Sequence, residues 1–237
     1  MLRSFRTGVH QIGRGLASKT PEHIPSTLSL EKATISDLPA LSRLFLSNFV
    51  HDEPHARALR MGNEAAPLFE AIAGSCLKQP YSLKLTDNAQ SHKLIGFRLL
   101  GIGHRDSSKD PYPVEVDIRA PNVLTFAKLM SESKKLWLDA LPHVNKVLRR
   151  EISYVMPAYQ RKGIGAYMLH YGLNFEKLKS DGVQGIVSEA TSLANQRLLS
   201  LNGYKEVAVL PDSAYENLNL QFENGTRNIK AYYLELK

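Results

Sequence analysis

The segment LRREISYVMPAYQRKGIGAY, residues 148–167, joins a strand, a glycine-containing loop and the start of a helix without a break. The first turn of a helix leaves about four backbone N–H groups without partners inside the helix, and the helix dipole makes that end electropositive. Gly163 and Gly165 have no Cβ, so an anionic group can approach these amides closely, and Arg161 and Lys162 add positive charge. The segment therefore predicts a phosphate-binding loop inside an α/β fold.

Two common phosphate-binding patterns, GxxxxGK[ST] and GxGxxG, do not occur in this segment. The rest of the chain alternates strands and helices, as the hydrophobic spacing shows. A further helix and the segment SLNGYKEV (200–207) follow the last predicted strand. The predicted strands cover 26–34, 81–87, 93–103, 148–156 and 184–190, and the predicted helices cover 36–49 with Ser36 as cap, 68–80, 123–141, and 164–178 ended by Ser180, Asp181 and Gly182.

Composition and cysteine content limit the class of protein. A chain of 237 residues with 43% hydrophobic side chains can bury one sizeable core, and we expect a single domain over 25–237. Its apolar runs fall short of the roughly 18 residues that a membrane-spanning helix needs. The only cysteine, Cys76, excludes an internal disulfide and is expected in the core. No HExxH or CxxC pattern occurs, and Pro54 separates His51 from His55, so we expect no metal ion.

Positive charge is concentrated at the N-terminus. The net charge is +7, but the first twenty residues hold Arg3, Arg6, Arg14 and Lys19 and no acid, so this segment supplies most of the excess. Its apolar residues recur every three or four positions, as on one face of a helix. Residues 1–24 therefore have the composition of a mitochondrial presequence or of a basic disordered tail. We expect a cytoplasmic or mitochondrial protein that does not bind nucleic acid.

The loop also fits a known acyltransferase motif. Residues Gln160 to Gly165 have the form [Q/R]xxGx[G/A]. Together with the preceding strand, the following helix and the tail SLNGYKEV, this motif resembles the GNAT superfamily of acyl-CoA-dependent N-acyltransferases over residues 26–237. The resemblance implies a mixed, mostly antiparallel twisted sheet flanked by helices, in which two parallel strands splay apart to admit an acyl-CoA.

The same resemblance implies ligands and their contacts. Acetyl-CoA is the expected co-substrate and a small amine the acceptor, with no metal, and the chain is expected to be a monomer or weak dimer. In that superfamily the loop amides hold the coenzyme A diphosphate, and the end of the preceding strand aligns the thioester. The positions implied here are Val155, Met156, Pro157, Gln160, Arg161, Lys162, Gly163, Ile164, Gly165, Ala166 and, from the later helix, Asn195.

A narrower resemblance lies in the segment NFVHDEPHARALRMG, residues 48–62. Arylalkylamine N-acetyltransferase-like enzymes carry an Asp-Glu-Pro sequence here, commonly followed by Leu, and their Glu acts as general base. Asp52, Glu53 and Pro54 match this pattern, and His55 departs from it. An alkylammonium must lose a proton before it can attack a thioester, which gives Glu53 a chemical reason. The alternative is a surface acid at a helix start, with Asp52 as cap and Pro54 in the first turn.

The proton donor for the departing thiolate is less clear from the sequence. Many GNAT enzymes use a Tyr on the helix after the fifth strand, and the corresponding position here is Leu199. Arylalkylamine-type enzymes often have two Ser residues four positions apart on that helix. Thr191 and Asn195 correspond to them and are the remaining candidate catalytic residues, although Thr191 could equally be the helix cap.

Three functions are compatible with these features. The Asp-Glu-Pro segment favours N-acetylation of a small primary amine, of the arylalkylamine type. A protein lysine or N-terminal acetyltransferase would use the same fold with an exposed peptide groove, and the insertion 104–142 favours a covered acceptor site instead. A non-catalytic acyl-CoA-binding protein is the third possibility, supported by Leu199.

Overall fold

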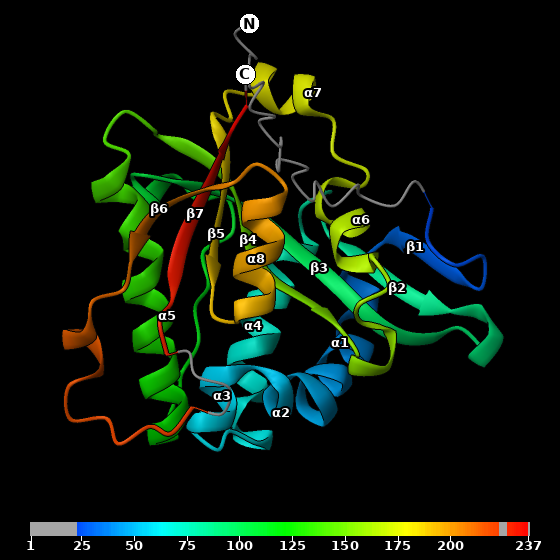
Figure 1. The fold of residues 1–237 in the computed structure, drawn as a ribbon, viewed down its shortest axis with the longest axis horizontal. Helices are drawn as coiled ribbons and strands as arrows, with labels where there is room; N and C mark the ends of the chain where they lie inside the picture. Colours follow the sequence, from blue (N-terminus) through cyan, green and yellow to red (C-terminus); the bar gives the residue numbers. More distant parts are fainter. Residues whose placement is uncertain (1–22, 223–226, 237) are drawn as a thin grey trace, which may run out of the picture.

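A computed structural model describes residues 23–222 and 227–236, so nearly all of the leader expected over 1–24 lies outside the described residues. A seven-stranded sheet runs through the molecule in the order β1-β2-β3-β4-β5-β7-β6 (Figure 1). Strands β4 and β5 pair in parallel, and the other neighbours in this sheet are antiparallel, as the sequence predicts. The strands are β1 (Leu28–Lys32), β2 (Leu83–Asp87), β3 (Lys93–His104), β4 (Lys146–Val155), β5 (Gly185–Ala190), β6 (Lys205–Val209) and β7 (Lys230–Glu235).

Helices cover both faces of the sheet because successive strand residues point to opposite sides. On β5, for example, Val187 packs with Trp137 of α5, whereas Ile186 packs with Leu169 of α6 on the other face. Figure 1 shows α6 and α8 on the near side of the strands and α4 on the far side. The helices are α1 (Leu38–Leu44), α2 (Val50–Asp52), α3 (Pro54–Ala58), α4 (Ala66–Leu77), α5 (Pro121–Ala140), α6 (Ile164–His170), α7 (Phe175–Ser180) and α8 (Leu193–Leu201).

The first predicted helix differs from the expectation at its start and near its end. A 3₁₀ turn precedes α1, and Thr34 rather than Ser36 begins it, because the Thr34 N–H donates to the Asp37 carboxylate at 2.8 Å. A π-helical segment, Phe45–Phe49, then joins α1 to α2. Such segments insert a residue into the helix and are frequent at functional sites. Here the segment leads directly to the Asp-Glu-Pro sequence.

The predicted helix over 164–178 is wrong as one element, because the structure divides it into α6 and α7. Gly172 has a φ of +71°, which a helix interior does not allow. Asn174 then caps α7 by accepting a hydrogen bond from the Lys177 N–H at 2.9 Å. The apolar spacing continues through the break, which is why periodicity alone did not reveal it.

Candidate active site

Strands β4 and β5 separate part-way along the sheet and open a gap between them. They pair only over Val147–Arg150 and Gly185–Ser188. The next residue of β4, Glu151, is a bulge, because the register on β3 jumps from Ile152 to Arg150. A cavity of about 510 Å³ occupies the gap beyond this point and extends to both faces of the sheet. This is the splayed parallel pair that the resemblance implies.

The glycine loop forms one wall of this cavity. Gly163 has a φ of +78° and immediately precedes α6, while the Gln160 side chain donates to the Val155 carbonyl at 2.7 Å and fixes the loop to the end of β4. Lys162 lies over the Tyr159 ring, 5.5 Å from its centroid, and does not line the cavity; nor do Met156 and Pro157. The predicted coenzyme-binding residues that do line it are Val155, Gln160, Arg161, Gly163, Ile164, Gly165, Ala166 and Asn195.

Glu53 lines the same cavity from the opposite direction. Its backbone is extended between α2 and α3, and its Oε2 accepts a hydrogen bond from the Ala56 N–H at 2.6 Å. Glu53 itself, rather than Asp52, is therefore the cap of α3, with Pro54 in the first turn. The side chain is only 6% exposed, and Oε1 is buried without a hydrogen-bond partner. One carboxylate oxygen thus caps α3, and the other is buried beside the His55 ring.

The buried His55 ring packs against the Glu53 carboxylate. Its Nδ1 lies 3.5 Å from Glu53 Oε1, and the ring is completely buried. Its Nε2 lies 3.1 Å from both the Tyr215 hydroxyl and the Arg227 carbonyl oxygen, and Tyr215 also donates to that carbonyl. The Arg227 carbonyl can only accept a hydrogen bond, so the neutral ring carries its proton on Nε2. The unprotonated Nδ1 then faces Glu53.

Asp52 and Tyr154 form a second polar contact in the cavity wall. The Tyr154 hydroxyl donates to Asp52 Oδ2. Burial, followed by this hydrogen bond and the Asp52 charge, raises the pKa of Tyr154 well above its usual range. The Tyr154 proton is thus held by Asp52, and this hydroxyl is poorly suited to protonate a leaving group.

The start of α8 brings Thr191, Ser192 and Asn195 to the cavity. Ser192 caps the helix, since its Oγ accepts from the Asn195 N–H at 3.2 Å, so Thr191 is not the cap. Leu199 is completely buried in the core, whereas Leu198 lines the cavity. The Ser192 hydroxyl was missed by the sequence reasoning, although Ser directly before an apolar helical run is a usual cap signal.

Two arginines that the sequence reasoning did not single out also line the cavity. Four hydrogen bonds run from Arg98 to main-chain carbonyls, including those of Leu169 and Tyr171 at the end of α6. Arg150 donates from Nη1 to Ser188 Oγ at 3.1 Å. Burial and then the Arg150 charge lower the pKa of Arg98 to about 9. A charged residue within an apolar strand pattern was the available signal for Arg98, whereas Arg150 stands between Arg149 and Glu151 and had no such signal.

Residues 104–142 contribute nothing to the described lining of this cavity, so the expectation that this insertion covers the acceptor site is wrong. Val116, Ile118 and Ala120 pack on the core between the sheet and α4 instead. The Tyr112 carbonyl accepts a hydrogen bond from Ser75 of α4 at 2.5 Å.

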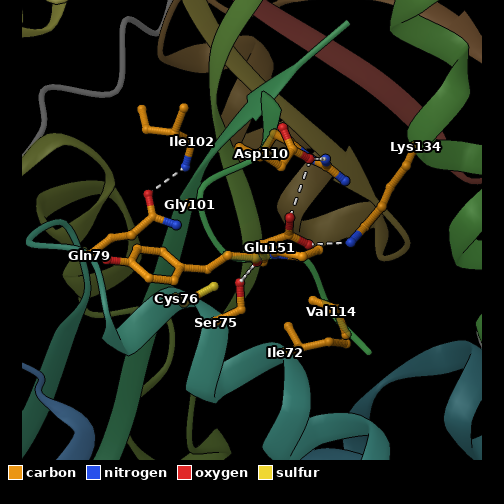
Figure 2. Close-up of a pocket in the computed structure, with 13 residues that line it drawn as sticks. Ile72, Ser75, Cys76, Gln79, Gly101, Ile102, Asp110, Val114, Lys134 and Glu151 are labelled. Carbon is orange, nitrogen blue, oxygen red and sulfur yellow. Dashed lines mark hydrogen bonds and ion pairs between the residues drawn. The ribbon is translucent and has the colours of Figure 1, made fainter. Parts of the chain in front are cut away.

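A smaller cavity of about 130 Å³ lies on the α4 and α5 side of the sheet (Figure 2). Lys134 reaches from α5 to Glu151, and Arg149 Nε lies 3.3 Å from the same carboxylate. Burial alone raises the pKa of Glu151, but the charges of Lys134 and Arg149 outweigh it and hold the pKa at about 2. Cys76 lines this cavity as a buried thiol, and burial raises its pKa well above its usual range. These paired charges hold the bulge of β4 in place.

The described part of the chain, 23–222 and 227–236, contains no group of three or more His, Cys, Asp or Glu residues placed to hold a metal ion. His51 and His55 lie on separate helices, as Pro54 predicts. In the same residues, no helix combines the length and apolar character needed to cross a membrane.

Comparison with known proteins gives matches in structure only. No protein-family model matches the sequence, and no curated protein does so. Arylalkylamine N-acetyltransferase 2 from Aedes aegypti matches with a TM-score of 0.70 over 90% of this chain and 100% of that chain, at 17% identity. Drosophila melanogaster polyamine N-acetyltransferase matches at 0.67 over 88% and 99%, at 12% identity. The C-terminal condensation domain of Ebony matches at 0.64 over 88% and 98%, at 15% identity. The chain has the GNAT acetyltransferase fold.

Proposed function

We propose that this chain is an acetyl-CoA-dependent N-acetyltransferase that acts on a small primary amine, with arylalkylamines as the expected class. The observation that carries the proposal is one continuous cavity, which joins the glycine loop to the buried Glu53 carboxylate through the gap between β4 and β5. The fold adds support, because it matches N-acetyltransferases that act on arylalkylamines and polyamines.

The residues of the loop would bind the coenzyme. The backbone amides from Arg161 to Ala166 would face the coenzyme A diphosphate, because the Gln160 N–H already donates to the Pro157 carbonyl at 3.1 Å, and Arg161 would supply a positive charge beside it. The pantetheine arm then lies against β4, whose residues beyond Arg150 have no β5 partner and offer backbone groups for hydrogen bonds. Val155 marks the loop end of this path and Asn195 its wall on the α8 side.

Glu53 would act as the general base. A primary ammonium has a pKa of about 10 and is not nucleophilic until it loses a proton. Asp52 and Glu53 attract the cation to the cavity, and the Glu53 carboxylate accepts its proton, directly or through a water molecule. The neutral amine nitrogen then bonds to the thioester carbonyl carbon, the carbon–sulfur bond breaks, and the second proton that the nitrogen loses is taken up by the departing thiolate, which gives an amide and coenzyme A.

Thr191 and Asn195 are the proposed contacts for the departing sulfur. Leu199 lies in the core, and the Tyr154 hydroxyl is bound to Asp52, so neither position supplies the proton. The Thr191 hydroxyl can donate a hydrogen bond to a thiolate, and the Asn195 amide can do the same without giving up a proton.

The decisive experiment measures free thiol released from acetyl-CoA. The purified chain is incubated with tryptamine, dopamine, a polyamine or a histone-like peptide in separate reactions. Release with the small amines, and not with the peptide, supports the proposal. Release with the peptide alone would assign protein acetylation instead. Tight acetyl-CoA binding with no release for any acceptor would indicate a non-catalytic acyl-CoA-binding protein.

A further inference from the structure

Arg150 is a buried cation that lacks a matching anion. The residue is 5% exposed, and its Nε is buried with no hydrogen-bond partner. Within the described residues, the Arg150 side chain makes one hydrogen bond, from Nη1 to the neutral Ser188 hydroxyl. No carboxylate of these residues lies within ion-pair distance of it. Glu189 is close enough for its charge to act on Arg150, but the two residues form no ion pair. Burial raises the pKa of Glu189, which favours its neutral form.

The other buried cations near the gap have more polar partners than Arg150, although the Nε atoms of Arg98 and Arg149 are also buried without a hydrogen bond. Arg149 and Lys134 pair with Glu151 on the α5 side of the sheet. Arg98 is surrounded by carbonyl oxygens, including those at the negative end of α6. Burying a charge without a partner is costly, so an unpaired arginine in a ligand cavity calls for an anion from the ligand.

The potential around Arg150 is positive. Burial, followed by the charges of Arg150 and Arg98, lowers the pKa of His170 to about 4, so this histidine is neutral at pH 7. Tyr204 is also neutral there, because burial raises its pKa to about 12. Asp52 and Glu53 line the same cavity. An amine cation is attracted to these two acids, and an anionic group is attracted to Arg150.

Arg150 lies at the floor of the gap. It forms the last register pair with Ser188 before β4 and β5 separate, and Val155, near the loop, lies five positions further along β4. Extended strand rises about 3.3 Å per residue, so this path is about 16 Å long. An acyl-CoA held by the loop, with its arm against β4, directs its acyl group along this path toward Arg150.

We propose that the acyl site accepts a short acyl chain that ends in a carboxylate, with Arg150 and Ser188 as its binding partners. This inference rests on the proposed function, because it deepens the identity of the acyl donor. The transfer itself is unchanged: the amine nitrogen bonds to the carbonyl carbon, the carbon–sulfur bond breaks, and the carboxylate is carried unaltered into the amide product. The planar Arg150 guanidinium suits a carboxylate, and the Ser188 hydroxyl can donate a further hydrogen bond.

The test compares two four-carbon donors that differ in this end group. Succinyl-CoA carries the carboxylate, and butyryl-CoA carries a methyl group in its place. Dissociation constants are measured by calorimetry on the full chain, beside acetyl-CoA and free coenzyme A. A buried charge-assisted hydrogen bond predicts that succinyl-CoA binds about 10-fold to 100-fold more tightly than butyryl-CoA.

Arg150→Gln should abolish this ratio. Arg161→Gln is the matched control, because it removes a cation of the same cavity at the loop and should weaken both donors together. Removal of an unpaired buried charge should not lower the melting temperature, and Arg150→Met is a second variant if Gln is not tolerated.

Three results would overturn the inference. One is equal binding of the two donors by the parent chain, and another is a succinyl preference that survives in Arg150→Gln. The third is an Arg150→Gln variant in which thiol release slows equally for both donors at an unchanged binding ratio, which would assign Arg150 to the thiolate. The proposed function fails separately, if no acyl-CoA binds or if none of the small amines causes thiol release, and the ratio of the two donors does not enter that result.

Discussion

Glu53→Gln is the variant that tests the proposed chemistry most directly. Gln keeps the size of the side chain and an oxygen that can still accept from the Ala56 N–H, so the cap of α3 is preserved. The change removes a buried negative charge whose Oε1 has no hydrogen-bond partner. Folding stability should therefore stay close to that of the parent, whereas loss of the same cap by truncation to Ala would cost about 1 kcal/mol.

Catalysis should respond very differently. General-base participation contributes roughly 10²-fold to 10⁴-fold, which corresponds to about 3 to 5 kcal/mol of barrier. We expect kcat for Glu53→Gln to fall by that factor in a thiol-release assay with acetyl-CoA and tryptamine. Activity should return only as the pH approaches the amine pKa of about 10, where the free amine is present without a base.

Asp52→Asn is the matched control for this experiment. Asp52 lines the same cavity and is bound by Tyr154, so its change removes one negative charge without removing the proposed base. If the acids serve only to attract the amine, both variants should raise KM and leave kcat similar. A Glu53→Gln variant with the parent's kcat and pH profile would refute the general-base assignment.

Three further predictions follow from the contacts. Gly163→Val should raise the KM for acetyl-CoA strongly, because a β-branched residue is strained at a φ of +78°, whereas Gly165→Ala should be tolerated in folding since its Cβ would lie 3.6 Å from Leu198; an unchanged KM for Gly163→Val would remove the loop from the site. His55→Leu should lower the free energy of unfolding in urea by about 1 to 3 kcal/mol, because it removes a buried partner of the Tyr215 hydroxyl; unaltered stability would contradict this. Because the pKa of Glu151 is depressed, its ion pairs stabilise the fold above pH 4.5, and this stability is lost as the pH falls toward 2. Glu151→Gln should therefore make the free energy of unfolding depend less on pH over that window, and the same pH dependence as in the parent would refute this.

Local features of the chain were predictable from the sequence. The strand, loop and helix around Gly163 follow from consecutive residues, and the structure confirms the mostly antiparallel sheet with a splayed parallel pair that the resemblance implies. Glu53 also stood out, because Asp-Glu-Pro is a contiguous pattern. Such signals depend on residues within one or two turns of each other.

The remaining features depend on contacts between distant residues. His55 meets Tyr215 across 160 positions of sequence, and Arg98 reaches the end of α6 across about 70. Their side chains have no local partner that would reveal their roles. The break after His170 was missed for another reason: Tyr171, Phe175 and Leu178 keep helical spacing, while a single glycine with positive φ redirects the backbone.

The bulge at Glu151 interrupts the regular pairing of β4 beside the cavity. The bulge interrupts the register with β3 directly beside Arg150, where the pairing of β4 with β5 ends. Deleting one residue at this point would restore an even register with β3 and would show whether the gap depends on the bulge. If the proposed function is correct, the β4 backbone groups that have no β5 partner form hydrogen bonds with the arm of the acyl-CoA. The ligand then occupies the position that a neighbouring strand would take.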